Sequence, residues 1–241
     1  MALAAAAAVT ETIRLGTYVA NAGAWDPMLL AVEVATLDRI SNGRALLGIG
    51  AGHTPSEWTD RSLRYPTAGE RVDHLLAVAT QTRAWLDARL EHPRPVQDRV
   101  PLLVGGNGRR VLEFARDHAD IVGVSGLAAT LADGHSHDTA WSIEEIDERL
   151  ALVRSTQRPL AIDALVQIVH LTDDRDAAAL RIGAATGLDP GELLRCPYAF
   201  VGLPDQIAEQ IETHRVRWGI TGYTVREDAL DALGEIRRAL A

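Results

Sequence analysis

The sequence contains no lysine, because all 24 of its basic residues are arginine. This absence excludes enzymes that need a lysine amine, such as P-loop nucleotidases, Schiff-base aldolases and pyridoxal enzymes anchored through lysine. The sequence also has a single cysteine, Cys196, among 241 residues. One cysteine cannot form an intrachain disulfide or a thiolate metal cage, which agrees with a reducing cytoplasm.

Positive charge is scarce as well, since 24 arginines against 33 acidic residues leave a formal net charge of -9. Such a field repels nucleic-acid phosphates and anionic lipids. No apolar run approaches the roughly 20 residues of a membrane span. The stretch from Met1 to Ala8 lacks the positive region of a signal peptide and is typical of a helix end. We therefore expect a cytoplasmic protein that binds neither nucleic acid nor membranes.

Short apolar runs alternate along the chain with stretches of helical period, a pattern typical of parallel strands covered by helices. The expected strands cover residues 13–19, 44–52, 101–105, 121–125, 161–171 and 222–225. The expected helices cover residues 27–40, 69–86, 109–118, 142–153, 173–185, 204–218 and 230–240. Six strands without return hairpins indicate an α/β fold, either a doubly wound sheet or a (β/α)8 barrel that lacks some units.

The run from Gly48 to His53 ends the second expected strand and is rich in glycine. It fails as a dinucleotide fingerprint, because His53 stands where the third glycine belongs and Pro55 prevents a helix from following directly. Missing side chains allow either a flat ligand or a neighbouring backbone to approach closely. His53 follows the strand end, where α/β folds place their functional side chains. It would have either a functional role there or a local hydrogen-bonding role.

A second glycine-rich segment, Gly105–Arg110, lies between an expected strand and the start of an expected helix. Free N–H groups, the positive end of the helix dipole and an arginine together favour a phosphate or carboxylate site. The alternative is a tight turn with two surface arginines.

The remaining candidate groups give no clear prediction of a metal site or a catalytic residue. The cluster Asp133–Asp138 contains metal-ligand types, but we interpret it as a solvated loop and expect no metal. Ser125 is not embedded in a nucleophile elbow, and no catalytic residue is predicted. Trp25 and Trp58 lie in loops after strands, where an aromatic ring either walls a planar ligand or packs in the core.

Five segments, in the same order, resemble the luciferase-like flavin and deazaflavin oxidoreductases. They are residues 12–17, 35–44, 47–52, 101–112 and 202–210. The resemblance is greatest to the branch that uses coenzyme F420, whose members commonly have Gly-Ala-Gly-Trp where this sequence has Gly50-Ala51-Gly52-His53.

The resemblance implies a (β/α)8 TIM barrel, with the cofactor ring in the barrel mouth and its phosphate on the loop Gly105–Arg109. It also implies a non-prolyl cis peptide at Tyr18–Val19. The cofactor-binding residues that it implies are Thr17, Tyr18, Val19, Asn21, Gly52, His53, Gly105, Gly106, Asn107, Gly108, Arg109 and Ser125.

In the family, the strand that resembles residues 13–19 is the third of eight. At roughly 30 residues per βα unit, two further units would occupy about 60 residues ahead of Met1. We therefore expect an incomplete barrel of about six βα units, resembling strands 3 to 8 and forming a single domain, 1–241, truncated at its N-terminus relative to the family. The exposed edge at residues 13–19 and the family likeness lead us to expect a homo-oligomer.

The function implied is an oxidoreductase that transfers a hydride between coenzyme F420 and an unknown small organic substrate. Three alternatives stay open: an FMN-dependent monooxygenase, a truncated inactive member that acts as a scaffold or partner subunit, and an ordinary phosphate-binding α/β enzyme such as an isomerase. The loops that would define the substrate, residues 54–68 and 128–140, carry no known signature.

Overall fold

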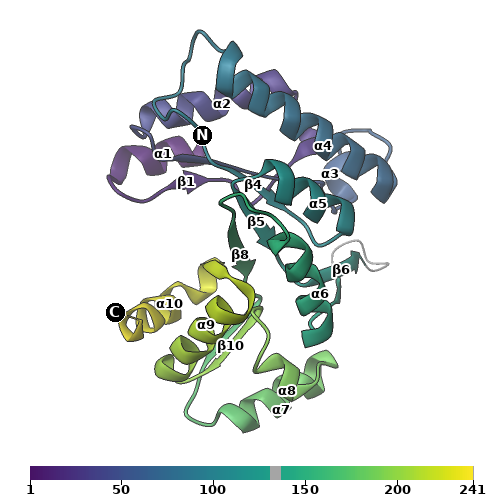
Figure 1. Ribbon diagram of the computed structural model, residues 1–241, viewed down its shortest axis with the longest axis vertical. Helices are drawn as coiled ribbons and strands as arrows, with labels where there is room; N and C mark the ends of the chain where they lie inside the picture. The colour runs from purple at the N-terminus through teal and green to yellow at the C-terminus, as the bar shows by residue number, and fades with distance from the viewer. Residues whose placement is uncertain (131–136, 241) are drawn as a thin grey trace. The chain divides into compact units, whose positions relative to one another are not determined.

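The computed structural model describes residues 1–130 and 137–240, which divide between two compact units. Unit 1 contains Met1–Val122 and Thr130, and unit 2 contains Gly123–Ala129 and the chain from His137 onward. Both units combine helices with parallel strands, as expected (Figure 1). No described helix is both long and apolar enough to cross a membrane. The single domain, 1–241, stays a prediction.

In unit 1 the strands follow the order β1-β3-β4-β5, and the short strand β2 also pairs with β3. The strands are β1 (Leu15–Gly16), β2 (Ala20–Asn21), β3 (Ala45–Gly50), β4 (Leu102–Gly105) and the beginning of β5 (Ile121–Val124). The helices are α1 (Ala2–Val9), η1 (Ala22–Ala24), α2 (Pro27–Ile40), α3 (Ser56–Thr59), α4 (Ala68–Ala84), η2 (Trp85–Arg89) and α5 (Arg109–His118). Helices α2 and α4 pack on β3, and α5 packs on β4.

In unit 2 the order is β5-β8-β11, while β9 pairs with β10 and β6 with β7 in two smaller sheets. The strands are β6 (Leu127–Thr130), β7 (His137–Thr139), β8 (Ala161–Leu165), β9 (Ile168–Leu171), β10 (Ala199–Gly202) and β11 (Ile220–Thr224). The helices are α6 (Ile143–Arg154), α7 (Arg175–Thr186), α8 (Pro190–Leu193), α9 (Pro204–Trp218), η3 (Glu227–Ala229) and α10 (Leu230–Ala239).

Two expected strands are each divided in the structure. Residues 13–19 contain only β1, because Thr17–Val19 leave the ladder before β2 resumes pairing with β3. Residues 161–171 divide at Val166, whose N–H still bonds to Thr224 O at 2.8 Å, whereas the N–H of Gln167 turns to Tyr198 O at 2.8 Å. The chain there changes partner from β11 to the segment that leads into β10. Strand β10 and the pair β6–β7 were not predicted, because short segments carry too little periodicity.

Local sequence signals account for the helix starts. Asp26 accepts hydrogen bonds from the N–H groups of Met28 and Leu29, and Pro27 occupies the first turn of α2. Thr67 and Glu70 form a capping box at the start of α4. These caps satisfy N–H groups that have no partner within the helix.

A buried carboxylate connects α2 to the sheet of unit 1. Asp38 is 0% exposed and accepts hydrogen bonds from the N–H groups of Val96 (2.7 Å), Gln97 (2.9 Å) and Ala45 (3.3 Å). The side-chain amide of Gln97 donates to it as well, at 2.6 Å. Four donors therefore compensate the cost of burying this charge.

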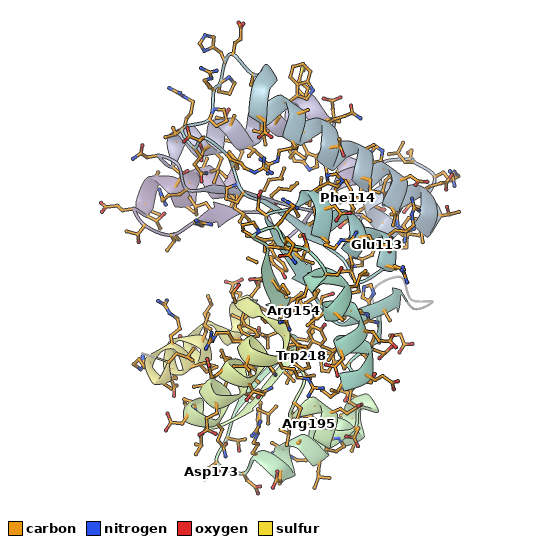
Figure 2. The ribbon with its side chains drawn as sticks, in the orientation of Figure 1. Glu113, Phe114, Arg154, Asp173, Arg195 and Trp218 are labelled. Carbon is orange, nitrogen blue, oxygen red and sulfur yellow. The ribbon has the colours of Figure 1, made fainter. Side chains whose placement is uncertain are left out.

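A buried histidine performs a similar connecting role in unit 2. His214 on α9 is 1% exposed, and its Nε2 lies 2.8 Å from the carbonyl oxygen of Arg195. Because a carbonyl only accepts, Nε2 donates to it, and Nδ1 accepts from the hydroxyl of Tyr223 at 2.9 Å. Trp218, which Figure 2 labels, lies at the end of the same helix. It packs on the imidazole ring and donates to Asp147 of α6 at 2.7 Å. Burial lowers the pKa of His214 to about 4.

We expect Asp38→Ala to lower the free energy of unfolding by about 3 kcal/mol, because it leaves several buried N–H donors without an acceptor. Urea unfolding at pH 7 measures this change. Asp98→Ala is the control, since Asp98 is an exposed aspartate next to Gln97. A loss for Asp38→Ala no larger than that of the control would contradict the argument.

We also expect His214 to make stability depend on pH. Between pH 6.5 and about 4 the unfolded chain binds a proton at this imidazole and the folded chain does not. The contribution of His214 is therefore complete above pH 6.5 and falls by about 1.4 kcal/mol per pH unit through this window. Unfolding of the wild type and of His214→Gln at pH 5 and 7 measures the slope, with the exposed His170→Gln as control. An unchanged slope in His214→Gln would refute the assignment.

Candidate functional site

A bulge at the end of β1 is the central feature of the site in unit 1. Leu15 and Gly16 pair with Ala45 and Leu46, and Ala20 and Asn21 pair with Ile49 and Gly50. Three residues, 17–19, therefore stand opposite two residues, 47–48, of the partner strand. The peptide bond Tyr18–Val19 within the bulge is cis, as the family resemblance implied. Thr17 anchors the bulge by donating from Oγ1 to Gly48 O at 2.6 Å.

Three glycines at the ends of β3 and β4 make room for this bulge. A Cβ at Gly48 would overlap the carbonyl oxygen of Thr17. A Cβ at Gly50 would lie 2.6 Å from Val19 Cγ2, and one at Gly105 would lie 3.0 Å from Val19 Cγ1. The glycine-rich strand end therefore accommodates a neighbouring segment at Gly48 and Gly50, and the close approach of a ligand to this strand end stays a prediction.

Asn21, next to the bulge, is held by other protein groups. Its side-chain Oδ1 accepts from Gly23 N–H at 2.9 Å, and its Nδ2 donates to Glu57 Oε2 at 2.6 Å. Gly52 has φ +70, and a Cβ there would overlap the Asn21 amide. Only a small part of this side chain is thus left to contact a cofactor ring.

Trp58 packs the loop that supplies Glu57 against Gly23. Trp58 is buried, and its indole ring occupies the space where a Cβ of Gly23 would lie. Arg61 donates to the carbonyl oxygen of Gly23 at 3.3 Å. Trp58 is therefore a packing residue of the loop and not a ligand wall, whereas Trp25 is 37% exposed.

The segment Gly52–His53 is held in place by residues that sequence reasoning missed. Arg71 of α4 donates from Nε to Gly52 O at 2.9 Å and lies over the ring of Tyr65 at 4.5 Å. The Tyr65 hydroxyl donates to His53 O at 2.9 Å. The His53 side chain is exposed. Glu57 and Tyr65 belong to the loop 54–68, which has no periodicity that could have marked them.

The second glycine-rich loop leads from β4 into α5. Gly106 has φ +159, where side chains are rare. Gly108 is the N-cap of α5, makes no side-chain capping bond, and has open space where a Cβ would be. Arg109 is exposed and pairs at 2.9 Å with Glu113, which Figure 2 labels. Arg110 pairs with Asp73 at 2.5 Å. The start of this helix is therefore open, and both arginines already have carboxylate partners.

Eleven of the twelve implied cofactor-binding residues belong to unit 1, and Ser125 belongs to unit 2. Its carbonyl oxygen accepts from Gln167 Nε2 at 3.3 Å. Gln167 Oε1 in turn accepts from Arg226 Nη2 at 3.0 Å. Residues that follow β5, β8 and β11 are thus connected within unit 2.

The described residues offer neither a cluster of metal ligands nor an activated cysteine. Among residues 1–130 and 137–240, no group of three or more His, Cys, Asp or Glu residues could hold a metal ion. Asp133–Ser136 of the acidic loop lie outside the described residues. Burial raises the pKa of the Cys196 thiol to about 12, so this cysteine is not an activated nucleophile.

Comparisons with known proteins agree with this geometry. The family model described as luciferase-like monooxygenase matches residues 1–187. An uncharacterized protein of Mycobacterium tuberculosis is 37% identical over 183 residues, covering 71% of this chain and 60% of the relative. An F420-dependent glucose-6-phosphate dehydrogenase of Intrasporangium calvum is 29% identical over 193 residues, covering 73% of this chain and 55% of that enzyme. These matches span less than two thirds of the relatives' own length.

A solved structure shows the same fold. The coenzyme F420-dependent tetrahydromethanopterin reductase from Methanopyrus kandleri has a TM-score of 0.69 at 18% identity, with 99% of this chain and 86% of that one covered. This likeness confirms the expected fold class, an α/β fold of parallel strands that forms an incomplete (β/α)8 barrel.

We expect Gly48→Ala to lower the free energy of unfolding by about 2 kcal/mol, because the new methyl group has to displace the backbone of Thr17. Thermal unfolding followed by circular dichroism measures the loss. Gly69→Ala on α4 is the matched control, since its Cβ meets open space, and we expect it to stabilise the helix by about 0.5 to 1 kcal/mol. Equal effects of the two substitutions would show that the bulge does not need a glycine at residue 48.

Proposed function

Because the chain belongs to the luciferase-like monooxygenase family, we propose that it acts as an oxidoreductase that transfers a hydride between coenzyme F420 and a small organic molecule. Two proteins similar to it support this choice of cofactor. One is the dehydrogenase at 29% identity and the other is the reductase of the same fold, and both are named as F420-dependent.

The open N-terminus of α5 is the observation that carries the proposal. The first N–H groups of an α-helix have no partner within the helix, and the helix dipole places partial positive charge there. No side-chain capping bond closes this end, and nothing lies within 4 Å of the position that a Cβ of Gly108 would take. The residues present therefore fit a phosphate group, which the N–H groups of α5 would hold.

The bulge fits the other part of such a cofactor. Tyr18 is 37% exposed and Val19 is 38% exposed, although Val19 also packs on Gly50 and Gly105. Each side chain therefore keeps an open apolar face at the carboxyl end of the strands, where barrel proteins bind their ligands. A flat ring would lie against this surface.

When bound, the deazaflavin supplies the hydride chemistry, and the protein has to orient it and exclude water. Asn21 keeps a fixed orientation through Glu57 and Gly23. Its backbone and that of Gly52 would present polar groups to the ring edge. This division of labour explains why the sequence contains no recognisable nucleophile or acid–base pair.

FMN is the alternative cofactor, and the description of the family as monooxygenases favours it. The phosphate of FMN would use the same N–H groups of α5. The two cofactors therefore differ in their rings and tails, which a direct titration compares.

We expect the purified chain to bind F420, measured by the change in deazaflavin fluorescence, and Gly108→Asp to weaken this binding at least about tenfold. Aspartate is a favourable N-cap residue, so the helix is retained. Its carboxylate, however, would repel the cofactor phosphate at the same N–H groups.

Gly69→Asp is the matched control, because it adds the same charge to the first turn of α4, where a Cβ also meets open space. We expect it to leave F420 binding unchanged. Equal weakening by both variants would refute the phosphate site. Binding of FMN without F420 would replace the proposed cofactor, and no binding of either at tens of micromolar would overturn the proposal.

A further inference from the structure

A cavity of about 250 Å³ lies within unit 2, at the carboxyl ends of β8 and β11. Its apolar lining residues include Val166, Ile168 and Val169, and its polar lining residues are Gln167, Arg226 and Asp228. Val166 is also buried in the same core cluster as Phe200. Its volume lies just below the roughly 300 to 1,000 Å³ of most ligand pockets and suits a ligand of a few heavy atoms.

Arg226 is the cation of this cavity, and a neutral side chain orients it. Nη2 donates to Gln167 Oε1 at 3.0 Å, and the other end of the Gln167 amide donates to Ser125 O. Within the described parts of unit 2, no carboxylate forms an ion pair with Arg226, whereas Arg215 and Arg217 both pair with acidic side chains. Gln167 therefore orients the exposed guanidinium without neutralising its charge.

Asp228 lines the same cavity and carries the opposite charge. No described residue forms an ion pair with it, and the two charges therefore remain available to a ligand. A simple anion would pair with Arg226 but would be repelled by Asp228. A simple cation would pair with Asp228 but would be repelled by Arg226. A molecule that carries both charges on neighbouring atoms satisfies both side chains.

We propose that this cavity binds a small zwitterion of the α-amino acid type with an apolar side chain. The carboxylate accepts from Arg226, the ammonium group donates to Asp228, and the side chain lies against Val166 and Ile168. Parallel-strand barrels bind substrates at the carboxyl ends of their strands, so this ligand is a candidate substrate. That role rests on the proposed function, but the binding itself does not require F420.

Titration of the full chain without cofactor tests the site, with L-valine, isovalerate and isobutylamine as probes. The three share the isobutyl group, and the last two each lack one charged group of L-valine. We expect L-valine to bind at least about tenfold more tightly than either analogue, because each charge-assisted hydrogen bond contributes about that factor. Isothermal calorimetry measures affinity, and chemical-shift changes in amide NMR spectra locate the ligand at Gln167–Val169.

Two substitutions separate the charges. Arg226→Gln should weaken L-valine binding at least about tenfold and leave isobutylamine unchanged. Asp228→Asn should weaken L-valine similarly and leave isovalerate unchanged or tighter. Arg238→Gln and Asp231→Asn on α10 are matched controls, because both residues are exposed and lie outside the cavity.

Equal binding of L-valine and isovalerate, or equal losses in the cavity and control variants, would overturn the proposal. The absence of L-valine binding at up to about 50 mM would overturn it as well. The cofactor titration is a separate measurement on unit 1, so failure of either proposal is visible without the other.

Discussion

The close packing of the bulge at residues 17–19 against the ends of β3 and β4 is the constraint on which the site in unit 1 depends. One extra residue in the first strand has to be accommodated, and the accommodation is steric, since residues 48, 50 and 105 lack the side chains that would collide with Thr17 and Val19. Because Val19 is held from beneath, its outer face and Tyr18 remain at the strand ends. The surface offered to a flat ligand is therefore a consequence of backbone packing.

A second layer of contacts keeps this arrangement in place. Glu57 accepts a hydrogen bond from Asn21, Trp58 packs against Gly23, and Arg71 donates to the carbonyl oxygen of Gly52. Glu57 and Trp58 lie beyond β3 along the chain and stabilise the turn that precedes it, whereas Arg71 holds the segment that follows β3. A substitution in this loop would change the orientation of Asn21 without touching a ligand, which makes the loop a means of adjusting the site.

Helices of regular period were predictable and irregular strand ends were not. Residues 27–40 and 109–118 form helices with the expected bounds, because caps and apolar spacing act locally. The division of residues 161–171 depends on Tyr198, which is remote in sequence. The cis bond at Tyr18–Val19 came from the family resemblance alone. For the site, the glycine positions were visible in the sequence, whereas Glu57, Tyr65 and Arg71 depend on long-range contacts in a loop without period.

Arginine is the chain's one strongly basic side chain, so the partner of each guanidinium indicates its role. Arg44 donates to backbone carbonyl groups near the end of α1, and Arg83 and Arg99 share Asp120. Their charges are compensated by acceptors that the fold requires, so these residues are structural. Arg226 differs, because a neutral amide orients it and no described carboxylate pairs with it. Arg226 is exposed, so water solvates its charge, and its position beside the cavity, held by a neutral amide, is the arrangement that the proposed zwitterion site uses.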